Sequence, residues 1–152
     1  MWLIFLDNIK GKYPEGFFLT TLYNFLNFIK EFSDVNTFIL SEKKIRTIEI
    51  EKEKSLKVIE KKVVISNVEG IVVSLTLTAT NMLIKNESLM KEFLNIIKKL
   101  EKDGPLIIFA GNPSFNQLNK YLEEYNVVFE PRIGLNWFNL NLRNRVSQYI
   151  KK

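Results

Sequence analysis

The stretch that decides the fold is LIIFAGNPSF, residues 106–115. Its first five residues are continuously apolar, which is typical of a strand buried on both faces of a parallel sheet. A Gly-Asn-Pro-Ser sequence follows, and Pro113 and Ser114 are residue types that favour the beginning of a helix. The stretch therefore predicts a buried strand at 106–110, a tight connection and a helix over 115–125.

The amino-terminal end of the chain repeats this pattern. Residues 2–6, WLIFL, form a second apolar run that stops at Asp7. After a loop with two glycines and a proline, apolar residues recur at helical spacing between residues 17 and 32. Strands that alternate with helices form layered α/β folds, so we expect both apolar runs to lie in one common sheet.

The middle of the chain has a different periodicity. Residues 45–50, 56–66 and 70–80 alternate apolar and polar side chains around two polar connections, which predicts an antiparallel three-stranded meander. Residues 86–102 predict a helix that Asn86 caps. The remaining expected elements are strands at 36–40, 127–130 and 138–142 and a short helix at 146–150.

Length and composition agree with a single globular domain over residues 1–152. The chain is 46% hydrophobic and 26% charged, close to the averages of globular proteins, and no linker or internal repeat divides it. The predicted fold class is α/β (α+β). It consists of a mixed β-sheet with a central antiparallel three-stranded meander and three to four packed helices.

Two residue types are missing, and their absence narrows the chemistry. The chain has no cysteine and no histidine, so thiolate metal sites, disulfides and histidine-based catalysis are excluded. We expect no cofactor and no metal. No apolar run approaches the length of a membrane span, and no secretory signal is recognisable, so we expect a cytoplasmic protein without membrane contact.

The strongest local pattern for ligand binding is the strand-to-helix connection at Gly111, Asn112 and Ser114. Ligands of α/β sheets bind at the carboxyl ends of strands, and the amino terminus of a helix favours an anion such as phosphate. A structural explanation is also available, because Ser114 and Gln117 have the spacing of a capping box.

A second pattern is Asp7-Asn8 at the end of the first apolar run. A carboxylate at this edge could hold Mg²⁺ or act as a base, although no second acid lies at metal-ligand spacing. Alternatively, Asp7 is a turn residue that bonds its own backbone. The hydroxyls of residues 76–81 would line one face of a strand, either for a polar ligand or because threonine is a good strand former.

The carboxyl-terminal segment is basic and carries aromatic residues. Aromatic side chains among cations can stack on single-stranded bases, or they can simply dock on the core. The candidate nucleic-acid contacts share positive charge or an aromatic ring: Trp137, Arg143, Arg145, Lys151 and Lys152.

Three functions remain open from the sequence. The first is a non-catalytic protein-interaction or regulatory domain that forms a homo-oligomer, suggested by the aromatic content of 12 Phe, 5 Tyr and 2 Trp. The second is a small-anion or nucleotide-binding domain that uses residues 111–114 on a phosphorylated small molecule. The third, less favoured, is nucleic-acid binding through the basic segment. The sequence does not decide whether the protein is an enzyme.

Overall fold

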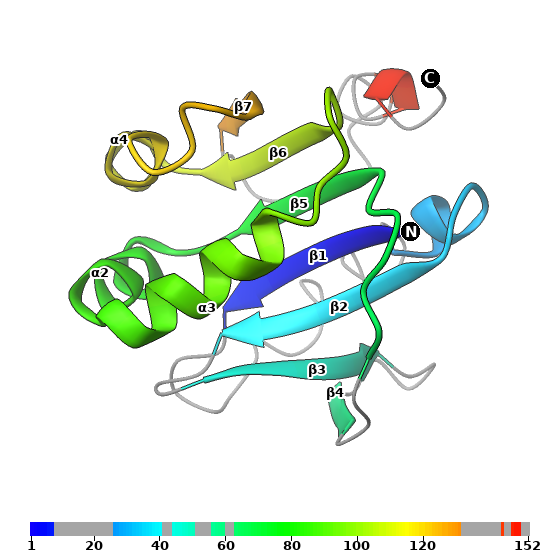
Figure 1. Ribbon diagram of the computed structural model, residues 1–152, viewed down its shortest axis with the longest axis horizontal. Helices are drawn as coiled ribbons and strands as arrows, with labels where there is room; N and C mark the ends of the chain where they lie inside the picture. Colours follow the sequence, from blue (N-terminus) through cyan, green and yellow to red (C-terminus); the bar gives the residue numbers. More distant parts are fainter. Residues whose placement is uncertain are drawn as a thin grey trace.

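The computed structural model describes residues 1–7, 26–40, 44–50, 56–59, 63–131, 144 and 147–149. These residues form a seven-stranded sheet of order β4-β3-β2-β1-β5-β6-β7 (Figure 1). The strands β2, β1, β5, β6 and β7 run parallel to one another, whereas β3 is antiparallel to its neighbours β2 and β4. The bounds are β1 Trp2–Asp7, β2 Val35–Leu40, β3 Ile45–Ile50, β4 Leu56–Ile59, β5 Gly70–Ser74, β6 Pro105–Ala110 and β7 Asn126–Pro131.

Helices cover both faces of the sheet. The first face packs against α2 (Leu77–Lys85), α3 (Glu87–Ile97) and α4 (Asn112–Asn119), and Figure 1 shows α3 lying in front of the strands. The helical residues 26–30 pack on the second face, where Leu26 and Ile29 are buried. The fold therefore has three layers, with the parallel strands in the middle.

The two faces explain why the first strand is continuously apolar. Leu3 and Phe5 point into the cluster beneath α2, α3 and α4, whereas Trp2, Ile4 and Leu6 point into the cluster of the second face. Successive side chains of a strand point to opposite faces, so a strand covered on both sides needs apolar residues at every position. Burying each such side chain contributes about 1.5–3 kcal/mol.

Gly70 is required by the close approach of a tryptophan ring. It lies beside Trp2 in the β1–β5 register, and a Cβ atom at this position would come within 2.3 Å of the Trp2 ring. Both residues are buried. The absence of a side chain at residue 70 therefore lets the indole lie flat against the start of β5.

The structure confirms the central prediction about the sheet and the predicted fold class. The apolar runs at 2–6 and 106–110 lie in one mixed α/β sheet, with β5 between them. An antiparallel three-stranded meander is present, but β2, β3 and β4 form it at one edge of the sheet. The expected membership of residues 70–80 in the meander was wrong, because β2 takes the place of that strand.

The third expected meander strand, 70–80, divides into two elements. Residues 70–74 form the parallel strand β5, which is buried on both faces, and residues 77–80 begin α2. Thr76 ends the extended segment because its hydroxyl oxygen accepts a hydrogen bond from the Ala79 N–H and caps the helix. A strand through residue 80 is therefore a wrong prediction.

The other elements follow the predictions with shifted ends. The expected helices at 86–102 and 115–125 are α3 at 87–97 and α4 at 112–119, and the expected strand at 56–66 ends at residue 59. Of the expected helix at 17–32, the described residues 26–30 are helical and residues 31–32 form a turn; of the expected helix at 146–150, the described residues 147–149 are helical. The expected strand at 138–142 lies outside the described residues.

Candidate functional site

The order of the parallel strands identifies one place, between β1 and β5, from which the following strands are added in opposite directions across the sheet. Across the sheet, the parallel strands lie in the order β2-β1-β5-β6-β7, which is a doubly wound arrangement. Between β1 and β2 in the chain, the helical residues 26–30 lie on the second face, whereas α2 and α3, between β5 and β6, lie on the first face. Ligands of such sheets bind at this switch point, outside the carboxyl ends of the two strands. The candidate site is therefore the carboxyl edge of β1 and β5.

Ser74 occupies the last position of β5 at this switch point. It lies between Leu6 of β1 and Phe109 of β6 in register, and all three residues are buried. The Ser74 side chain is 2% exposed, and its Oγ has no hydrogen-bond partner in the described part of the chain. A buried hydroxyl without a partner costs about 1–3 kcal/mol. Such a group calls for a partner that the described residues do not supply.

The amino terminus of α2 lies directly beyond Ser74. The Thr76 carbonyl accepts hydrogen bonds from the N–H and from the hydroxyl of Thr80, each at 2.9 Å. These bonds fix the first turn, in which Leu77 and Thr78 are exposed and no acidic residue occurs. The first N–H groups of a helix have no partner within the helix, and the dipole concentrates positive potential there.

The amino terminus of α4 lies at the same edge, one strand further along. Gly111 is its N-cap in an extended conformation, without a side-chain hydrogen bond, and Pro113 follows within the first turn. Gly111 and Asn112 are exposed, whereas Ser114 is buried, and this first turn also lacks an acid. Because the helix begins at residue 112, Ser114 lies inside it, and the predicted capping box with Gln117 is wrong.

The structure brings only some of the predicted site residues together. Asp7 is the last residue of β1 and follows Leu6, the register partner of Ser74. From the strand spacing and rise per residue, the Cα atoms of Asp7 and Ser74 are about 6 Å apart, whereas Gly111 lies about 10 Å from β1. The Asp7 side chain and Asn8 lie outside what the structure describes.

Sequence reasoning missed Ser74 and the role of Thr76. The hydroxyls of residues 76–81 were expected along a strand face, but they belong to the cap and first turns of α2. The sequence did carry a signal for the end of the strand and the start of the helix. In residues 72–76, VVSLT, the polar Ser74 ends an apolar run, and Thr76, a helix-capping residue type, follows two positions later.

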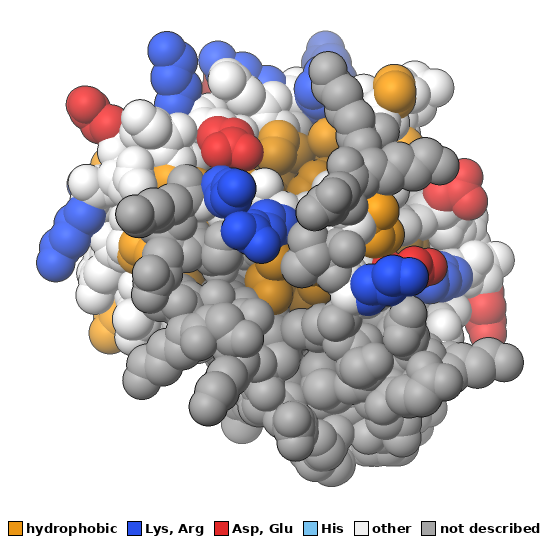
Figure 2. Space-filling view, turned by 90° about the horizontal axis from the view of Figure 1, so that it is seen from below, with side chains coloured by type: hydrophobic (Ala, Val, Ile, Leu, Met, Phe, Trp, Pro, Cys, Tyr) orange, Lys and Arg blue, Asp and Glu red, His pale blue; other side chains and the backbone are white. Residues whose placement is uncertain are grey.

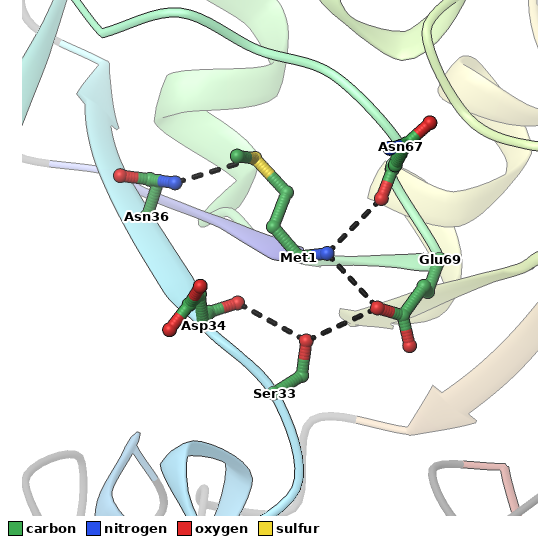
Figure 3. A network of polar contacts seen from close by, with 6 residues as sticks. All are labelled: Met1, Ser33, Asp34, Asn36, Asn67 and Glu69. Carbon is green, nitrogen blue, oxygen red and sulfur yellow. Dashed lines mark hydrogen bonds and ion pairs between the residues drawn. The ribbon is translucent and has the colours of Figure 1, made fainter.

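The opposite edge of the sheet is held by a polar network around the amino terminus (Figure 3). The Met1 ammonium donates to the Asn67 carbonyl and pairs with Glu69 Oε1, each at 3.0 Å. Ser33 Oγ donates to the same Glu69 oxygen at 3.3 Å. These contacts tie the beginnings of β1, β2 and β5 together, which is a structural role.

Two cavities of about 510 and 620 Å³ lie at this amino edge, and both are lined by residues Glu101–Gly104. Tyr125 lines the second one. Burial raises the pKa of Tyr125 above its ordinary value of 10.0, and the charge of Glu124 and a hydrogen bond with it raise the pKa further. Strand amino ends are not the edge at which doubly wound sheets bind ligands.

Other predicted features are not tested or are not found. The candidate nucleic-acid residues lie outside the described residues: Trp137, Arg143, Arg145, Lys151 and Lys152. Over the ranges that the structure describes, no cluster of three or more acidic residues could hold a metal ion. Within the same ranges, none of the helices has the length and apolar character needed to cross a bilayer.

Comparisons with known proteins leave the family open. No protein-family model matches the chain, and no curated protein matches it. A solved structure of a protein of unknown function from Methanothermobacter thermautotrophicus is similar to it at 15% sequence identity, with a TM-score of 0.39. The alignment covers 87% of this chain and 79% of that one. The chain is thus characterised by its doubly wound sheet and by the Ser74 hydroxyl at the switch point, which has no partner among the residues that the structure describes.

Proposed function

We propose that this protein is a regulatory domain that binds a small anionic molecule, of the phosphorylated-metabolite or nucleotide class, at the carboxyl edge of β1 and β5. The observation that carries the proposal is Ser74, whose buried Oγ lacks a partner among the described residues at the switch point. Ser74 points to the second face, as Val72 does, whereas α2 and α4 lie on the first face, so the ligand would extend across the end of β5. A ligand oxygen would there accept the Ser74 O–H and remove the cost of leaving it unpaired.

The charge of the ligand is argued from the two helices that begin at this edge. α2 and α4 follow the neighbouring strands β5 and β6, pack against each other, and have no acid in their first turns. Each helix amino terminus is equivalent to roughly half a positive charge. Two such ends side by side favour a phosphate, and the formal net charge of +5 also favours an anion.

A binding role is proposed in place of catalysis because of the missing side chains. The chain has neither histidine nor cysteine, the commonest sources of a neutral-pH base and of a nucleophile. Binding without turnover needs only the donors already named. A change in the first turn of α2 on ligand binding would pass to α4, because the two helices are in contact.

Thermal-shift measurements test the proposal. Inorganic phosphate, pyrophosphate, AMP, ATP and a panel of sugar phosphates would be added to the full chain. A ligand at 100 times its Kd adds about 2.7 kcal/mol of apparent stability, which raises the Tm by roughly 5–10 °C for a chain of this size. Ser74→Ala should lose most of that shift. The absence of a shift with every compound, or an equal shift in the variant, would contradict the proposal.

Self-association and nucleic-acid binding remain predictions. Light scattering coupled to size-exclusion chromatography tests the first, and a strict monomer at high concentration would count against it. For the second, a chain truncated after Leu142 should lose binding to single-stranded nucleic acid, and binding by the full chain should fall steeply with salt.

A further inference from the structure

A second site, distant from the carboxyl edge of β1 and β5, arises where β2 and β3 diverge. Their ladder ends at the pair Thr37–Ile48, although β2 begins at Val35 and β3 continues to Ile50. Figure 1 shows the two strands close together at the carboxyl end of β2 and apart toward the arrowhead of β3. In an antiparallel ladder, one of the next two residue pairs would exchange two backbone hydrogen bonds. Because the strands diverge, the two residues of that pair do not form these hydrogen bonds with each other.

A cavity of about 460 Å³ lies at this divergence, within the size range of small-molecule sites. Both strands supply polar groups to its wall, among them Asn36 of β2 and Thr47 of β3. Leu26 and Val63 supply apolar surface. Figure 2 looks onto the β3–β4 edge of the sheet and shows hydrophobic side chains between lysine and arginine side chains.

Two opposite charges lie on the wall of the cavity. Lys30 comes from the helical residues 26–30 and Glu49 from the end of β3, and both side chains are exposed. In the part of the chain that the structure describes, neither takes part in an ion pair. A ligand with a carboxylate and an ammonium group would match both charges.

We propose that this cavity binds a short free peptide of two or three residues with an apolar side chain. Two unmatched positions on each strand correspond to a length of about 7 Å, which is the length of an extended dipeptide. The peptide backbone would complete the interrupted ladder by strand addition. Its carboxylate would lie near Lys30, its amino group near Glu49, and its apolar side chain against Leu26 and Val63.

Isothermal titration calorimetry on the full chain tests this site with defined peptides. Leu-Leu and Leu-Leu-Leu should bind. N-acetyl-leucyl-leucinamide, which lacks both terminal charges, should bind several-fold more weakly. Glu49→Gln and Lys30→Met should each weaken Leu-Leu by about two- to fivefold, as expected for exposed charge contacts. Val63→Trp should fill the cavity and abolish binding.

The control is Arg46→Met, which removes an exposed charge from the same strand but lies off the cavity wall. It should bind Leu-Leu like the wild-type chain, and thermal melting would verify that each variant is folded. If Val63→Trp does not fold, the two charge variants decide the matter. No binding of either free peptide would overturn the proposal, as would equal binding to Val63→Trp or equal binding of the blocked peptide.

Discussion

The Ser74→Ala variant removes one oxygen atom from the carboxyl end of β5 and is expected to stabilise the ligand-free protein. The wild-type hydroxyl is buried without a partner in the described part of the chain, which costs about 1–3 kcal/mol. The small void left by the oxygen costs up to about 1 kcal/mol in lost packing. The net expectation is a gain of about 1 kcal/mol, or roughly 2–4 °C in Tm for a chain of 152 residues.

Thr80→Val is the matched control, because it also removes one buried hydroxyl. Thr80 is 0% exposed, and its Oγ1 donates to the Thr76 carbonyl at 2.9 Å. Valine keeps the shape of the side chain and loses only this hydrogen bond. The variant should therefore be destabilised by about 1 kcal/mol, with the opposite sign to Ser74→Ala.

Urea denaturation followed by tryptophan fluorescence measures both changes, since Trp2 is buried and reports on unfolding. The comparison is made on ligand-free protein at fixed salt and pH. A loss of more than about 1 kcal/mol in Ser74→Ala would refute the reasoning, because it would mean that the hydroxyl is already satisfied in the folded chain.

Three further predictions concern the amino edge. Gly70→Ala should destabilise the protein by about 1–3 kcal/mol in urea denaturation, because the new Cβ would overlap the Trp2 ring, and an unchanged midpoint would contradict the packing described here. Glu69→Gln should reduce stability by no more than about 1 kcal/mol, with the difference shrinking in high salt, because the carboxylate is 53% exposed beside the terminal ammonium. Ultraviolet titration of Tyr125 should give a pKa above 10.0, and Glu124→Gln should lower it toward that value. The raised pKa means that the folded state favours the neutral phenol of Tyr125. This contribution to stability is therefore present below pH 10 and is lost as the pH rises through the folded pKa. A pKa of 10.0 for Tyr125 in the folded protein would contradict this prediction.

Much of the architecture could be predicted because burial on both faces leaves a strong pattern. The runs at 2–6 and 106–110 are continuously apolar, so their place inside one sheet follows from the chemistry of covering both faces. The helix after Asn86 was also predictable, because that side chain accepts from the Leu89 N–H as a capping residue does.

The direction and neighbours of β5 could not be predicted in the same way. Residues 70–75 alternate only weakly, and the apolar set Ile71, Val73 and Leu75 would suit either an antiparallel edge or a parallel centre. Partner choice depends on where the chain crosses the sheet, which local pattern does not encode. Because residues 70–80 were predicted as one meander strand, Ser74 was expected in the middle of a strand and not at the switch point where β5 ends.

The prediction of the ligand-binding loop was limited for a related reason. Gly111 and Asp7 were two separate candidates at strand ends, and β5 separates their strands, so the residues nearest to the end of β1 are those after β5. A sequence shows which segments end at a strand edge. It does not show which strands are neighbours in the sheet, and therefore which strand ends lie side by side.

The most direct test of the proposed site is a titration of the ¹⁵N-labelled protein with inorganic pyrophosphate, followed by two-dimensional NMR. If the anion binds between the amino termini of α2 and α4, the largest and saturable amide shifts will occur in residues 75–79 and 111–115. Shifts confined to the amino edge around Glu101–Gly104, or no saturable shifts, would contradict a binding site at the carboxyl ends of β1 and β5.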